Sequence, residues 1–137
     1  MIYDEVITGF AKTGTMFAAQ TFSVTPDIIC CAKGPSNGAV PIAAMIARED
    51  MADAFWGRPE DEAQFAHGNT FAGNPLACAV GISVINEIVG HELDKKAVRL
   101  GDYLTAKLEE LKNTAWSAKS AAKAFCMAWS WSRTSEP

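Results

Sequence analysis

The feature that most constrains this chain is a short apolar run that ends in a single lysine. Residues 27–33 read Asp-Ile-Ile-Cys-Cys-Ala-Lys, and a loop that contains Gly34, Pro35 and Gly38 follows. An apolar run of this length between turn-forming residues predicts a buried strand. Such a strand would deliver Lys33 to the end of a sheet, where α/β folds bind their ligands. Taken alone, Lys33 has a simpler interpretation, a strand-end lysine that only reaches solvent.

Composition favours a globular protein and argues against several classes of partner. The 137 residues are 49% hydrophobic and carry a formal net charge of -4, which suits one modest domain without a basic surface for nucleic acid or anionic membranes. The longest apolar stretch, residues 75–89, is interrupted by Asn86 and Glu87 and is too short to span a bilayer. We therefore expect a soluble protein with neither nucleic acid nor membrane as partner.

Cysteine and histidine usage predicts a reduced protein without a metal centre. The four cysteines have neither zinc-like nor Cys-x-x-Cys spacing, and the chain shows no signal peptide. His67 and His91 form no metal-binding pattern, and His67 is better interpreted as a residue that stabilises its loop. Free thiols in a reducing cytosol explain the cysteines most simply, so we expect a cytoplasmic protein.

The order of predicted elements indicates an α/β fold. Two more strands are expected, at residues 2–6 and 41–47. In the first of them, the alternation of side chains puts Asp4 and Val6 on one face and Glu5 on the other. Helices are expected at residues 49–56, at 75–89 with Asn74 as N-cap and Pro75 in the first turn, and at 92–112. The helix at 75–89 is apolar nearly all round, which predicts that it is buried.

Three strings, taken together, resemble the class III aminotransferases of fold type I, which use pyridoxal 5'-phosphate (PLP). They are residues 2–10 (IYDEVITGF), residues 26–34 (PDII before AKG) and residues 67–75 (HGNTF before GNP). Each is weak alone, but all three occur in the family's order, and the resemblance covers roughly residues 1–112. It implies that residues 1–112 are the C-terminal half of a large PLP-binding domain, a mixed sheet with packed helices.

The resemblance also implies roles for four residues. Lys33 would bond covalently to the cofactor aldehyde and then, once freed, carry the proton between substrate and cofactor carbons. Asp4 would hold the protonated pyridine nitrogen, and Val6 would pack against the ring. Thr70 would bind the cofactor phosphate of a neighbouring subunit, which implies a homodimer with a shared active site. The simpler alternatives are a turn-capping carboxylate for Asp4, a core valine for Val6 and a locally capping hydroxyl for Thr70.

The chain departs from the family pattern at two positions near these residues. Ala11 and Lys12 stand where the family often has glycine and arginine. Lys12 keeps the charge but lacks the planar, two-pronged guanidinium, so a structural contact there is expected to weaken. Neither departure falls on Asp4, Lys33 or Thr70.

The beginning and the end of the chain both predict a fragment. Met1 leads directly into a strand, and residues 113–137 do not resemble the family. We hypothesise a changed reading frame. Read from the third base of the Asn113 codon, permitted codons allow H-G-L-V-G-E-V-R-G-K-G-L-L-H-G-V-E-L-V-K-D, which closely resembles the family segment after this helix. The tail as written is then aberrant, and disordered or poorly packed; the alternative is a genuine, divergent C-terminal helix.

The function implied by the resemblance is a transamination. An amino group would move from an amine or ω-amino acid to a 2-oxo acid such as pyruvate, and residues 36–41 weakly favour the ω-amino acid–pyruvate branch. Two alternatives remain open. One is another PLP enzyme of the same fold, such as a glutamate-semialdehyde aminomutase, and the other is a non-catalytic fragment that pairs with full-length subunits.

Overall fold

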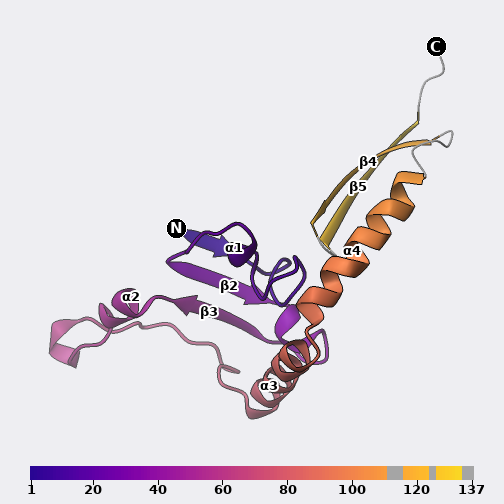
Figure 1. Ribbon diagram of the computed structural model, residues 1–137. Coiled ribbons are helices and arrows are strands. Elements are labelled where there is room, and N and C mark those ends of the chain that lie inside the picture. The colour runs from indigo at the N-terminus through magenta and orange to yellow at the C-terminus, as the bar shows by residue number, and fades with distance from the viewer. Residues whose placement is uncertain (111–115, 124–125, 134–137) are drawn as a thin grey trace.

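The computed structural model describes residues 1–110, 116–123 and 126–133 (Figure 1). Its centre is a three-stranded mixed sheet in the order β1-β2-β3, made by Ile2–Asp4, Ile28–Ala32 and Ala43–Ala47. Strands β1 and β2 are parallel, and β3 runs antiparallel to β2. The predicted α/β class and mixed sheet are confirmed, although β1 is shorter than expected and β3 begins two residues later.

Helices follow the strands in the predicted order. The described ones are α1 (Ala18–Thr21), α2 (Glu49–Asp53), α3 (Pro75–Gly90) and α4 (Leu93–Glu109), with single 3-10 turns η1 (Gly34–Ser36) and η2 (Pro59–Asp61). Asn74 caps α3 as predicted: its Oδ1 accepts a hydrogen bond from the Ala77 amide at 3.1 Å, which satisfies one of the donors that a helix leaves unpaired. Figure 1 shows α2 and the chain after it extending away from the sheet.

The buried core is small and lies between the sheet and α3. It consists of Phe10, Ala11, Cys31 and Ile88, against which Met16, Phe17, Val84 and Leu93 pack. Cys31 is the β2 residue in this cluster, and it is 2% exposed. The sheet, the loop after β1 and the two long helices therefore meet at one point.

The prediction that α3 is buried is wrong for most of its length. Only Gly81 and Ile88 are buried, whereas Leu76, Ile82 and Val89 are 66%, 61% and 63% exposed. An all-round apolar pattern shows that a helix has no polar face, but it does not show which segments cover it. Among the described residues, none covers the outer face of α3.

The tail contains a two-stranded antiparallel hairpin in the described part of its backbone. Strand β4 (Trp116–Lys123) pairs with β5 (Cys126–Arg133), beside the end of α4 in Figure 1. These residues therefore form strands rather than the helix considered as an alternative. The division at residue 112 and the changed reading frame remain predictions, which the DNA sequence would test.

No single described helix is both long and apolar enough to cross a membrane. Only α3 and α4 taken together meet the criteria of length and composition, and they are bent by 67° at the break between them.

Candidate functional site

The ends of β1 and β2 bring the two principal predicted residues to one edge of the sheet. Asp4 is the last residue of β1 and pairs with Cys30 of β2, and Lys33 directly follows the last residue of β2. Because the two strands are parallel, their carboxyl ends meet at the same edge. Both side chains are exposed. This edge of a parallel pair is where α/β folds bind ligands.

Asp4 has one carboxylate oxygen engaged and one available. Its Oδ1 accepts a hydrogen bond from the backbone amide of Val6 at 3.0 Å, which fixes the orientation of the carboxylate. Within the described residues, no hydrogen bond or ion pair engages Oδ2. The capping role considered as the simpler alternative and the role of acceptor for a ligand are therefore compatible. Val6 itself is half-buried.

Lys33 occupies an unusual backbone conformation. Its φ is 58° and its ψ is -68°, values close to those of a strained γ-turn. For a residue with a Cβ, such a conformation costs on the order of 1–3 kcal/mol and persists only when its surroundings impose it. Immediately after Lys33, η1 begins, and its Pro35 and Ser36 are buried. The strand thus ends in a rigid turn that holds the lysine at the sheet edge.

The loop after β1 reaches across to this turn. Phe10 lies so close to Gly34 that a Cβ placed on the glycine would be 2.7 Å from the Cβ of Phe10. The ring of Phe10 also makes an edge-on contact with the ring of Phe17, with centroids 5.5 Å apart. The residue that follows Lys33 must therefore be glycine for the loop to approach as it does.

Glu5 is a functional candidate that sequence reasoning did not identify. It is 1% exposed, and it is the largest side chain in the described part of the chain that is fully buried. Its carboxylate accepts hydrogen bonds from the amides of Ala18 and Ala19 and from the hydroxyl of Thr8. The alternation in β1 put Glu5 on the face opposite Asp4, but the sequence did not show that α1 would lie there.

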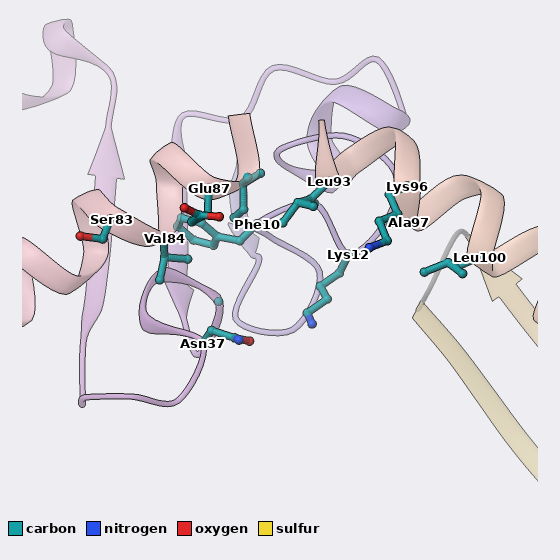
Figure 2. Close-up of a pocket in the computed structure, with 13 residues that line it drawn as sticks. Phe10, Lys12, Asn37, Ser83, Val84, Glu87, Leu93, Lys96, Ala97 and Leu100 are labelled. Atoms are coloured by element: carbon teal, nitrogen blue, oxygen red, sulfur yellow. The ribbon is translucent and has the colours of Figure 1, made fainter. Parts of the chain in front are cut away.

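A cavity of about 470 Å³ lies between the same loop and the helices α3 and α4 (Figure 2). In Figure 2, Phe10 lies beside Val84 and Glu87 of α3, and Leu93 projects from the start of α4. Asp4, Lys33 and Thr70 do not line it. The cavity is therefore a gap between the helices and the loop, and it borders the turn after Lys33 through Gly34 and Asn37. Its lining residues are Phe10, Ala11, Lys12, Gly34, Asn37, Ser83, Val84, Glu87, Ile88, Leu93, Lys96, Ala97 and Leu100.

Thr70 and His67 lie on a different part of the molecule. Both are exposed, on the segment that leads into α3. The ring of His67 makes an edge-on contact with Phe65. No hydrogen bond of the described residues joins Thr70 to Asp4 or Lys33. Across the described ranges, no cluster of three or more His, Cys, Asp or Glu side chains could hold a metal ion.

Sequence comparisons identify a family for the chain. The family model described as aminotransferase class-III matches residues 1–121. The omega-amino acid–pyruvate aminotransferase of Pseudomonas putida is 37% identical over 82% of this chain and 25% of its own length. The acetylornithine aminotransferase of Clostridium acetobutylicum is 46% identical over 82% of this chain and 27% of its own length. The chain therefore spans about a quarter of the length of these curated relatives.

Solved structures agree with this result. An aminotransferase from Bacillus anthracis superimposes with a TM-score of 0.84 at 35% identity, over 90% of this chain and 27% of that one. An (S)-enantioselective omega-transaminase from Thermomicrobium roseum gives a TM-score of 0.83 at 34% identity, over 92% of this chain and 28% of that one. The match in sequence and in fold has one explanation: the chain belongs to the class III aminotransferase family.

Proposed function

We propose that this chain is part of a PLP-dependent transaminase that moves an amino group from an amine or ω-amino acid to a 2-oxo acid such as pyruvate. The observation that carries the proposal is the placement of Asp4 and Lys33 at the carboxyl ends of two adjacent parallel strands. Membership of the aminotransferase family supports the class of reaction. A related taurine:2-oxoglutarate aminotransferase has been solved in complex with PLP and glutamate.

The residues at the sheet edge fit the chemistry of PLP. When bound, PLP supplies an electron sink for the substrate carbon, and the protein supplies the groups that hold and tune it. The available Oδ2 of Asp4 can accept a hydrogen bond from a protonated ring nitrogen. The exposed amine of Lys33 can bond to an aldehyde and, once released, can move a proton. Val6 would pack against the ring, and Thr70 would bind the phosphate from a second subunit of a homodimer.

The proposed donor class rests on the relatives. They are named as omega-amino acid–pyruvate, putrescine, acetylornithine and omega-aminotransferases, and an ω-amino group is the simplest common expectation. We also propose a cytoplasmic location. Cys30, Cys31 and Cys78 are free thiols, which is usual in a reducing compartment.

Borohydride reduction tests whether this chain assembles the site. The purified 137-residue chain is incubated with PLP, reduced and mapped by peptide mass spectrometry. We expect one dominant pyridoxyl adduct on Lys33, with occupancy lowered in Asp4→Ala and unchanged in Lys107→Arg, which alters an exposed lysine of α4. An adduct spread evenly over the exposed lysines would overturn the proposal for this chain.

A second candidate is a non-catalytic piece that pairs with full-length subunits. The exposure of Leu76, Ile82 and Val89 along α3 favours it, because large apolar surfaces usually mark contacts with another protein. This candidate predicts co-purification with a full-length homologue and no adduct on Lys33. An aminomutase would give the adduct but would exchange the amino group within one molecule, so the products of a half-reaction separate it from a transaminase.

A further inference from the structure

We propose that Glu5 is a positioning residue that fixes the turn carrying Lys33 relative to Asp4. The inference rests on the proposed function, since it concerns the same pair of residues. Glu5 directly follows Asp4, and its backbone amide donates a hydrogen bond to the Cys30 carbonyl at 2.8 Å. It therefore lies where the pairing of β1 with β2 ends, directly after Asp4 and opposite Cys30, which shortly precedes Lys33 in the sequence.

The side chain of Glu5 ties this point to the loop that follows. Oε1 accepts from the Ala19 amide at 2.8 Å, and Oε2 accepts from the Ala18 amide at 3.0 Å and from Thr8 Oγ1 at 2.6 Å. A buried carboxylate is costly unless it is fully hydrogen-bonded. Because both oxygens are engaged, the carboxylate holds residues 8, 18 and 19 of this loop against Glu5. We call these three hydrogen bonds the Glu5 clamp.

The loop held by the Glu5 clamp in turn contacts the lysine turn. The Gly9 amide donates a hydrogen bond to the Glu5 carbonyl at 3.0 Å, and this fixes the backbone directly before Phe10. Phe10 lies against Gly34, the residue after Lys33, at a distance that leaves no room for a Cβ. The strained φ of Lys33 needs surroundings that impose it. The contact of Phe10 with Gly34 constrains the residue directly after Lys33. A continuous path therefore runs from Asp4 through Glu5 and Phe10 to Lys33.

The path predicts that loosening the Glu5 clamp changes the site at a distance. In Glu5→Gln, one acceptor oxygen becomes an amide that faces the N–H of Ala18 or Ala19 or the hydroxyl of Thr8, so at least one hydrogen bond is lost. In Thr8→Val, one donor is removed and the carboxylate stays. Neither substitution touches Asp4 or Lys33. Misplacement of a reacting group by about 1 Å can lower reactivity by roughly a hundredfold, so we expect a reduction of roughly tenfold or more in the selectivity for Lys33.

The experiment measures the ratio of pyridoxyl adduct on Lys33 to that on Lys107, at a temperature well below the unfolding midpoint of each variant. We expect the ratio to fall in Glu5→Gln and, less strongly, in Thr8→Val. The matched control is Thr105→Val, which removes a hydroxyl that donates to the Gly101 carbonyl of α4. A purely structural role would lower the unfolding midpoint and leave the ratio unchanged in folded protein, and that result would overturn the inference.

Hydrogen exchange separates this inference from the proposed function, because it needs no cofactor. In folded Glu5→Gln, we expect faster amide exchange in the peptide that contains residues 31–36 as well as in residues 8–19. Faster exchange confined to residues 8–19 would contradict the path to Lys33. If the unaltered chain gives no Lys33 adduct, the proposed function fails, and exchange still decides the role of Glu5. If Glu5→Gln does not fold, Thr8→Val decides it.

Discussion

Two regions of the molecule carry predicted site residues, and they differ in how far other residues of this chain pack around them. The sheet-edge region holds Asp4 and Lys33 and has a buried, fully hydrogen-bonded Glu5 at its base. The region from residue 54 to α3 holds Thr70, and its Phe71 is 81% exposed. The first region is fixed by contacts within this chain. The second presents apolar and polar groups that no described residue covers.

The largest expected effect comes from Lys33, the residue on which the sheet-edge region converges. Both Lys33→Ala and Lys33→Gly should abolish the site-specific pyridoxyl adduct, because the reacting amine is gone. The two variants should differ in stability. Glycine adopts a positive φ without a Cβ penalty, so Lys33→Gly should be more stable to urea than Lys33→Ala by about 1–2 kcal/mol.

Equal stability of the two variants would show that the turn after β2 is not strained in solution. A specific adduct that persists on another lysine would instead show that this other lysine, and not Lys33, reacts with the cofactor.

The second expected effect compares one residue type in the two regions. Cys31 is 2% exposed in the core under β2, whereas Cys78 of α3 is exposed. Burial raises the pKa of the Cys31 thiol, and the thiolate is the reactive form. Near pH 8, iodoacetamide should therefore alkylate Cys78 faster than Cys31, because Cys78 is exposed and burial keeps more of the Cys31 thiol protonated.

The rate for Cys31 should rise further at higher pH, since the fraction of thiolate grows as pH approaches a raised pKa. Equal rates at Cys31 and Cys78, measured by peptide mass spectrometry on folded protein, would mean that the core under β2 opens readily. That result would remove the contrast between the two regions.

The third expected effect tests the close approach of the loop to the lysine turn. In Gly34→Ala, the new Cβ would lie 2.7 Å from the Cβ of Phe10, so the loop must shift, at a cost of about 1–3 kcal/mol in the free energy of unfolding. The matched control is Gly90→Ala, at the end of α3, where a Cβ meets nothing within 4 Å. There the change should be neutral or stabilising by up to about 1 kcal/mol. Equal denaturation midpoints for the two variants would refute the close contact.

Much of the sheet-edge region could be predicted from the sequence, for physical reasons that its residues make plain. The apolar run before Lys33 and the turn residues after it define β2 and its end by local chemistry alone. The alternation predicted for residues 2–6 put Asp4 and Glu5 on different faces; in the structure β1 ends at Asp4, and Asp4 is exposed whereas Glu5 is buried. The cap at Asn74 was also correct, because capping depends on two or three neighbouring residues.

What could not be predicted depends on contacts between segments distant in sequence. Nothing in the sequence showed that the amides of Ala18 and Ala19 would meet the carboxylate of Glu5, or that Phe10 would lie on Gly34. The exposure of α3 was missed for the opposite reason: its composition shows an apolar surface, but burial depends on what other segments supply. The position of Thr70 relative to Asp4 likewise depends on contacts with other segments, which the sequence does not show.

The smallest expected effect on stability belongs to Thr70→Val, and it addresses the second region directly. Thr70 is exposed, so the isolated chain should change by no more than about 0.5 kcal/mol in the free energy of unfolding. The same substitution at Thr8 removes a hydrogen bond to the buried Glu5 and should cost about 1–2 kcal/mol.

If Thr70 completes the site of a second subunit, Thr70→Val should weaken PLP binding only at chain concentrations at which sedimentation shows a dimer. Equal PLP affinity of the variant and the unaltered chain when both are dimeric would exclude the shared site. A stability loss as large as that of Thr8→Val would show that the Thr70 segment packs within its own chain after all.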